Sequence, residues 1–288
     1  MMMKMKLKQR LAIGYYKTKL NTIALISPRK AAEKAFELFC TPFPASRKLK
    51  APPVFHQAEK LSFQLNHQTI NGWRWKSELP NPKKVLIAHG FNSYSYKFEK
   101  YVSSLKREGF EVLAFDAPAH GSSTGKKINV LLYRDMILHI EKNYGQLYGI
   151  MSHSLGGLAA SLAAEKITTL QKLVLIAPAA ETNRAVDNFF NLIRLNHSIK
   201  KDFEELLIEL AGQPLSYFSI GRALNQINAN TLWMHDTEDK VCSFEDVIPV
   251  QAMQLPHVKF YITKGLGHSR IYKENKVAKE VISFLASV

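Results

Sequence analysis

A serine that follows a short apolar run is the first residue whose setting suggests chemistry. The apolar run at 147–151 leads into the sequence SHSLGG, after which a helical pattern begins. This strand, tight turn and helix around a serine is typical of a nucleophile elbow, whose usual pattern is Gly-x-Ser-x-Gly. The predicted nucleophile is therefore Ser154. Ser152 replaces the first glycine of the pattern, and we interpret it as a tolerated small residue.

Serine becomes an effective nucleophile only when a base takes its proton and an acid orients that base. The predicted base is His268, which lies in the flexible sequence KGLGH after the last apolar run. Three carboxylates, Asp236, Glu238 and Asp239, follow an earlier apolar run and are candidates for the acid. Serine, acid and histidine in this chain order are typical of one hydrolase class and not of the chymotrypsin or subtilisin classes.

A serine hydrolase also needs two backbone N–H groups that stabilise the negative charge on the carbonyl oxygen. Leu155, directly after the nucleophile, is expected to supply one. The second is expected from Phe91 in the sequence HGFN, which follows the apolar run at 85–88. Gly90 would let this loop approach the nucleophile closely.

The elements that must position these residues alternate along the chain. Short runs that are apolar throughout are typical of strands covered on both faces, and they lie at 85–88, 112–115, 147–151, 173–177, 231–234 and 258–262. Helical stretches are expected at 97–108, 128–142, 155–166 and 276–286, and a hairpin at 60–66 and 68–76. This order predicts an α/β fold, in which a mostly parallel sheet has helices on both faces and an antiparallel edge. Chemistry in such sheets lies at the carboxyl ends of the strands.

One interval, 181–228, contains no predicted strand and is expected to form a helical cap, with helices at 186–195 and 203–210. We expect its apolar side chains to build a pocket for the acyl group of a substrate, namely Phe189, Phe190, Leu192, Ile193 and Leu195.

The N-terminal part differs from the rest in charge. The net charge is +15, of which +10 falls in the first 50 residues. Ser27 and Pro28 predict a helix start before 29–39, and Leu7, Leu11 and Tyr15 predict a second apolar face. Residues 1–53, which end in a proline-rich linker at 41–53, are expected to form a basic helical extension, and residues 54–288 the main domain. The extension is expected either to pack on the main domain or to contact an anionic membrane or a protein partner.

Several functional classes are excluded or unsupported. No run of 18 consecutive apolar residues is present, which excludes an integral membrane protein. The chain has no nucleic-acid-binding signature, phosphate loop, dinucleotide motif or Cys/His spacing for a metal, so we expect no cofactor, no metal and no nucleic-acid partner. The N-terminus lacks the features of a secretory signal, and we expect a cytoplasmic protein with Cys40 and Cys242 as free thiols.

Taken together, the residues from about 60 to 288 resemble the α/β-hydrolase superfamily. The motifs that carry the resemblance are HGF at 89–91, DAPAHGSS at 116–123, the elbow at 152–156, the acid loop at 235–239 and Gly267-His268. The resemblance implies an eight-stranded sheet with a cap after the sixth strand, and Asp239 as the acid. It implies that His120 is structural, and we expect His153 and His235 to have no catalytic part. The expected function is a cofactor-free serine hydrolase, favoured as a carboxylesterase for small or medium acyl groups. An acyltransferase or thioesterase with the same residues, or a non-catalytic binding module, are the alternatives.

Overall fold

The computed structural model describes residues 7–43 and 50–287. Part of the proline-rich linker predicted at 41–53, and the first six residues, lie outside the described residues. The chain forms two compact units. We call residues up to 41 together with 181–218 the helical unit, and residues 42–180 together with 219–288 the sheet unit.

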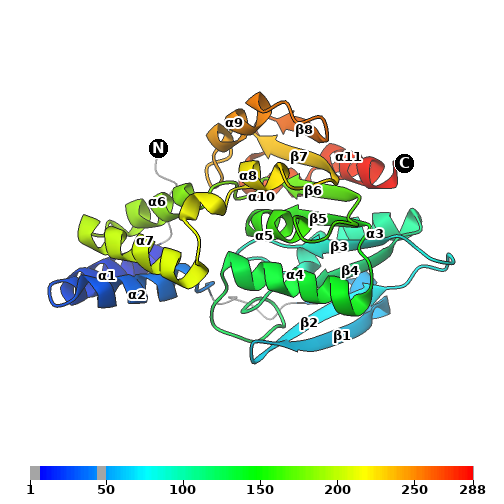
Figure 1. Cartoon of the computed structure of the whole chain (residues 1–288). Helices are drawn as coiled ribbons and strands as arrows, with labels where there is room; N and C mark the ends of the chain where they lie inside the picture. Colours follow the sequence, from blue (N-terminus) through cyan, green and yellow to red (C-terminus); the bar gives the residue numbers. More distant parts are fainter. Residues whose placement is uncertain (1–6, 44–49, 288) are drawn as a thin grey trace. The chain divides into compact units, whose positions relative to one another are not determined.

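The sheet unit contains one eight-stranded sheet with the strand order β1-β2-β4-β3-β5-β6-β7-β8 (Figure 1). β1 and β2 form the predicted hairpin, β2 also pairs antiparallel with β4, and all other neighbours are parallel. The strands are β1 (Glu59–Leu65), β2 (Gln68–Trp75), β3 (Lys84–Ala88), β4 (Glu111–Phe115), β5 (Gly149–His153), β6 (Lys172–Ile176), β7 (Asn230–Asp236) and β8 (Val258–Thr263). The predicted fold class is confirmed.

Helices cover both faces of this sheet (Figure 1). One face carries α3 (Glu99–Arg107) and α11 (Asn275–Ala286), and the other carries α4 (Val130–Tyr144), α5 (Leu155–Ala164) and α8 (Ile220–Leu224). Because each face is covered, every residue of β4, β5 and β6 is buried, which explains their continuous apolar sequences. The remaining helices are α9 (Val247–Ala252) and α10 (Gly267–Arg270), with single 3-10 turns at Pro53–Gln57, Ser95–Phe98, Phe244–Asp246 and Ile271–Lys273.

The strand order places a switch in chain direction beside β3. From β3 the chain moves to β4 on one side and then returns to β5 on the other. The loops that follow β3 and β5 therefore diverge at their carboxyl ends, and such a divergence leaves a crevice in which parallel sheets bind ligands.

The helical unit joins two segments that are distant in sequence. It contains α1 (Leu7–Ala24), α2 (Pro28–Phe39), α6 (Thr182–Ile193), α7 (His197–Ala211) and a 3-10 turn at Leu215–Tyr217. Ser27 caps α2 as predicted, since its hydroxyl oxygen accepts a hydrogen bond from the Lys30 N–H at 3.2 Å. α2 packs along α7, and the Arg29 guanidinium forms an ion pair with Glu209. The N-terminal helices thus share one core with the inserted helices.

That core bears on two predictions. Leu20 is buried in it, whereas Leu11 and Tyr15 are 64% and 59% exposed, so of the two outcomes expected for their apolar face they do not show packing on the described chain. Phe190 and Ile193, expected to line an acyl pocket, are buried, and the pocket stays a prediction. An aromatic cluster holds Phe190 in place against Phe203, with ring centroids 5.1 Å apart. The helical period alone identified an apolar face, but not which neighbour would cover it.

No helix in the described part of the chain combines the length and the apolar character needed to cross a membrane.

Removal of the central ring of the helical unit should unfold it. Phe203 is fully buried and also contacts Phe36 and Phe39 of α2. Phe203→Ala is expected to destabilise this unit by about 3–5 kcal/mol. Hydrogen exchange of the amides of α2 and α7 measures the loss. Leu192→Ala, at a side chain 48% exposed, is the matched control and should change exchange little.

Candidate functional site

The turn between β5 and α5 holds Ser154 in a rare backbone conformation. Its φ is +54° and its ψ is −123°, outside the regions that side-chain-bearing residues normally adopt. The Ser154 N–H donates to the carbonyl of Ile176 at 3.2 Å, and the Ser154 carbonyl accepts from the N–H groups of Gly157 at 2.8 Å and Ala179 at 3.1 Å. These bonds fix the conformation, in which Ser154 stands at the carboxyl end of β5 and at the start of α5.

Small residues around the turn allow this close packing. A Cβ on Gly156 would stand 2.6 Å from the carbonyl oxygen of Ala88, and a Cβ on Gly90 would stand 2.8 Å from the Cβ of Ser154. Both positions therefore exclude any side chain. As a result, the loop after β3 lies directly against Ser154.

Ser152 fits the elbow despite the missing glycine. It is fully buried, and its hydroxyl donates a hydrogen bond to the Val174 carbonyl of β6 at 2.8 Å. A buried hydroxyl is tolerated when it has such a partner. Serine in place of glycine at position 152 therefore directs its hydroxyl into the sheet, toward Val174, and not toward the hydroxyl of Ser154.

The three side chains predicted as nucleophile, base and acid lie in contact. His268 Nε2 is 3.1 Å from Ser154 Oγ, and His268 Nδ1 is 2.8 Å from Asp239 Oδ2. An acidic partner at Nδ1 places the proton there, which leaves Nε2 free to accept the proton of the Ser154 hydroxyl. Ser154 and Asp239 are buried, and the His268 side chain is 12% exposed.

Asp239 is held as a carboxylate. Burial acts to raise its pKa, but hydrogen bonds from His268 and from the N–H groups of Val241 and Cys242 outweigh burial and lower the pKa overall. Of the two alternatives, Glu238 is exposed and Asp236 is buried with different partners.

Asp236 connects the acid loop to the loop of His268. Its Oδ1 accepts from the Glu238 N–H at 3.0 Å, and its Oδ2 accepts from the Leu266 N–H at 2.9 Å and the Thr263 hydroxyl at 2.7 Å. Burial acts to raise the pKa of Asp236, but these hydrogen bonds lower it overall. Asp236 therefore positions the loop before His268 and does not contact the imidazole.

Two histidines support the loop that carries Phe91. The Asn92 N–H donates to His120 Nε2 at 3.1 Å, and the Ala117 N–H donates to His89 Nε2 at 2.9 Å. Each ring must therefore carry its proton on Nδ1, which donates to the carbonyl of Pro118 for His120 and of Gly90 for His89. Burial lowers the pKa of both rings, to about 3 for His89. The expectation that His120 is structural agrees with these contacts.

The predicted donors to an oxyanion, Phe91 and Leu155, lie in the loop after β3 and at the start of α5. Leu155 is the first residue of α5, so its N–H has no acceptor within the helix. Phe91 is held between Gly90, which contacts Ser154, and Asn92, which is fixed by His120. Both residues therefore flank the turn at Ser154.

Two neighbours of Ser154, Asp239 and His268 were not predicted from the sequence. His153 Nε2 lies 3.2 Å from the carbonyl oxygen of His268, and burial lowers the His153 pKa to about 3. Because a carbonyl only accepts, the neutral ring donates through Nε2–H and so holds the backbone of His268. The backbone N–H of Cys242 donates to Asp239 Oδ1 at 3.0 Å, and burial raises the pKa of the Cys242 thiol. His153 was expected to have no catalytic part, and nothing in the sequence placed its ring beside the backbone of His268.

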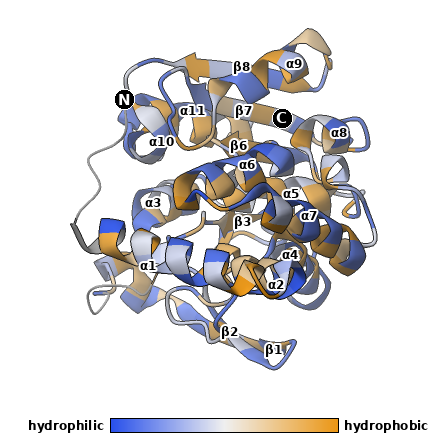
Figure 2. Cartoon of the chain, turned by 90° about the vertical axis from the view of Figure 1, so that its left-hand side faces the viewer, coloured by the Kyte–Doolittle hydropathy of each residue, from blue (hydrophilic) through white to orange (hydrophobic). Residues whose placement is uncertain are grey.

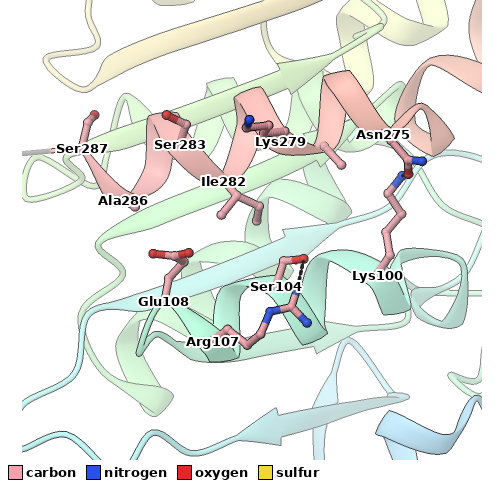
Figure 3. Close-up of a pocket in the computed structure, with 11 residues that line it drawn as sticks. Lys100, Ser104, Arg107, Glu108, Asn275, Lys279, Ile282, Ser283, Ala286 and Ser287 are labelled. Atoms are coloured by element: carbon pink, nitrogen blue, oxygen red, sulfur yellow. Dashed lines mark hydrogen bonds between the residues drawn. The ribbon is translucent and has the colours of Figure 1, made fainter.

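A groove of about 760 Å³ between α3 and α11 is separate from this site (Figure 3). It is lined by Lys100, Arg107 and Lys279 among others, and by none of the residues with predicted chemistry. Within residues 7–43 and 50–287, no three His, Cys, Asp or Glu side chains are grouped as a metal ion would require.

Comparisons with known proteins agree with the geometry. Residues 80–211 match a family model described as serine aminopeptidase, S33. A proposed esterase/lipase of Mycoplasma genitalium is 32% identical over 229 residues, covering 65% of this chain and 84% of that protein. The rat monoglyceride lipase is 24% identical over 180 residues, and the match spans 58% of this chain but only 55% of the lipase.

Solved structures share the fold. An esterase of Pyrococcus furiosus superposes with a TM-score of 0.63 at 20% identity, covering 84% of this chain and 97% of the esterase.

The neutral histidines predict a loss of stability in acid. His89 and His153 have folded-state pKa values of about 3, below the ordinary 6.5, so between these values the unfolded chain binds more protons. Their contribution is complete above pH 6.5 and is lost as the pH falls toward 3. We expect the free energy of unfolding to decrease by about 1–2 kcal/mol per histidine between pH 7 and 5. Denaturant unfolding at both pH values measures this decrease, and His153→Gln should reduce it. An equal decrease in wild type and His153→Gln would contradict the prediction.

Proposed function

The chain belongs to the α/β-hydrolase superfamily, and from that premise we propose that it is a serine hydrolase that cleaves carboxylic esters. The observation that carries this proposal is the unbroken series of contacts from Asp239 through His268 to Ser154. The names of its relatives, esterase and lipase, support esters as the substrate class. A small-molecule acyl ester is thus the proposed partner of the site.

In the proposed reaction, Ser154 Oγ attacks the ester carbonyl while its proton passes to His268 Nε2. Asp239 keeps the Nδ1 proton in place and stabilises the imidazolium that forms. The N–H groups of Leu155 and Phe91 donate to the oxygen that becomes negatively charged. His268 then gives its proton to the departing alcohol, which leaves an acyl group on Ser154.

The second half of the reaction repeats these roles with water. His268 removes a proton from a water molecule, whose oxygen attacks the acyl carbonyl, and the acid is released when the proton returns to Ser154. The lowered pKa of Asp239 supports this cycle, because the acid stays ionised while His268 gains and loses its proton.

The proposal includes a cytoplasmic location. The support is that Cys40 and Cys242 are both buried and are not joined in a disulfide, as is usual in a reducing compartment.

Labelling with a fluorophosphonate tests for an activated serine. Wild type should be labelled and should hydrolyse p-nitrophenyl acyl esters. Ser154→Ala and His268→Ala should take up no label, and each should lower kcat by about 10⁵-fold or more. Asp239→Asn should lower kcat by about 10⁴-fold because the histidine proton is misplaced. Ser161→Ala removes another buried serine, hydrogen-bonded within α5, and should keep the label.

A folded wild type that takes up no label would refute the proposal. A series of acyl lengths then defines the acyl group that reacts fastest. Product analysis with an added alcohol separates hydrolysis from acyl transfer, because a transferase would form the new ester in preference to the free acid.

His153 is proposed as a positioning residue for His268. His153→Leu removes the hydrogen bond to the His268 carbonyl and should lower kcat by about tenfold, equivalent to roughly 1.4 kcal/mol, with KM nearly unchanged. His153→Gln should restore most of kcat, because its amide can donate to the same carbonyl. Steady-state kinetics of both variants measure the effect. Equal losses of kcat in both would contradict a positioning role.

A further inference from the structure

The outer face of α1 is an apolar stripe without a partner in the described structure. Leu11, Tyr15, Leu25 and Ile26 are 64%, 59%, 85% and 88% exposed. Leu11 and Tyr15 lie one turn apart on one side of α1, and Leu25 and Ile26 follow in the turn after the helix ends, about 20 Å along the axis from Leu11. The buried face of α1, at Leu20, lies on the opposite side. α1 therefore has two apolar faces, of which only one is packed.

The most exposed part of the stripe is ordered. The Leu25 N–H donates to the Thr22 carbonyl at 3.3 Å and the Ile26 N–H to the Ile23 carbonyl at 3.1 Å, before Ser27 caps α2. These bonds fix two large apolar side chains at the tip between α1 and α2. Exposed neighbours of this size at one tip are unusual in a surface that faces only water.

Positive charge flanks the stripe. Residues 7–24 contain four Lys or Arg and no Asp or Glu, and along α1 blue and orange segments alternate in Figure 2. The Lys19 ammonium lies 5.6 Å from the centre of the Tyr15 ring, at the edge of the stripe. Arg10 and Lys17 are exposed, and neither forms an ion pair with any residue the structure describes. In α2, by contrast, Arg29 and Lys34 are paired with glutamates.

We propose that this surface, made of α1 and the tip at Leu25 and Ile26, docks the protein on an anionic lipid bilayer. The apolar side chains would enter the boundary between headgroups and acyl chains while the flanking lysines contact the negative headgroups. A zwitterionic bilayer would accept the apolar side chains but has no net negative charge to attract the lysines. The proposal concerns the helical unit alone and does not depend on the proposed ester hydrolysis.

The exposed surface of α7 provides a matched control for the apolar side chains of the stripe. Ile208 and Leu210 are 43% and 59% exposed, like the stripe, but they lie among the acidic residues Glu204, Glu205 and Glu209. These glutamates are paired with Lys200, Lys201 and Arg29, so no excess positive charge surrounds Ile208 and Leu210 to attract an anionic bilayer.

Co-sedimentation of the full chain with phosphatidylcholine vesicles, with and without phosphatidylglycerol, tests the proposal. Wild type should bind the anionic vesicles and should bind the zwitterionic vesicles weakly. At about 1 M salt the screening length falls to about 3 Å, so the protein should be released from the anionic vesicles. Lys17→Glu with Lys19→Glu, and Leu25→Ser with Ile26→Ser, should each lower binding about tenfold or more. Ile208→Ser with Leu210→Ser, and Lys126→Glu with Lys127→Glu, should bind as wild type does.

All of these positions are exposed, and thermal unfolding checks that each variant folds. The proposal would be overturned if wild type bound both kinds of vesicle equally. It would also be overturned if the variants at Lys17 and Lys19, or at Leu25 and Ile26, bound like wild type. So would a dimer that Leu25→Ser with Ile26→Ser converts to a monomer without loss of lipid binding, because the stripe would then contact a second copy of the chain.

Discussion

The strained backbone of Ser154 is the constraint around which the sheet unit is arranged. A residue with a side chain at φ +54° and ψ −123° costs about 1–3 kcal/mol and persists only where surrounding contacts enforce it. Here β6 and the chain after it supply those contacts through Ile176 and Ala179. Gly90 and Gly156 follow from the same constraint, since the strand, the helix and the loop after β3 meet at one point. The strained turn thereby places the Ser154 hydroxyl at the carboxyl end of β5, 3.1 Å from His268 Nε2.

Buried histidines position the loops around Ser154, and burial keeps these histidines in the neutral form. His89, His120 and His153 are all neutral because the interior disfavours their charged state, and each has a hydrogen bond that fixes its proton on one nitrogen. A neutral imidazole can donate at one end and accept at the other, so His89 and His120 each connect two backbone segments. His268 differs from these three histidines because it contacts both a carboxylate and a serine hydroxyl.

The sheet, and the contact among Ser154, Asp239 and His268, could be predicted from the sequence because each depends on local pattern. Continuous apolar runs mark buried parallel strands, and Ser154, Asp239 and His268 each follow such a strand. The packing of the helices could not be predicted in the same way. Leu11 and Tyr15 share an apolar face whose spacing fits packing or an external contact, and only the structure shows that they are exposed, as only the structure shows that Phe190 packs against Phe203. Helical period shows which residues share a face, while the partner of that face depends on contacts between distant segments. The hydrogen bond from His153 to the His268 backbone is equally non-local.

The composition of the helical unit has a consequence for how the chain matures on the ribosome. α2 ends at Phe39 and its partner helices begin at Thr182, so about 140 residues are translated between them. At bacterial or eukaryotic elongation rates this takes on the order of 10 s. During that time Leu20, Ala31 and Ala35 have no covering helix, although they are fully buried in the finished structure. The first two helices therefore cannot complete their core until α6 and α7 have been synthesised.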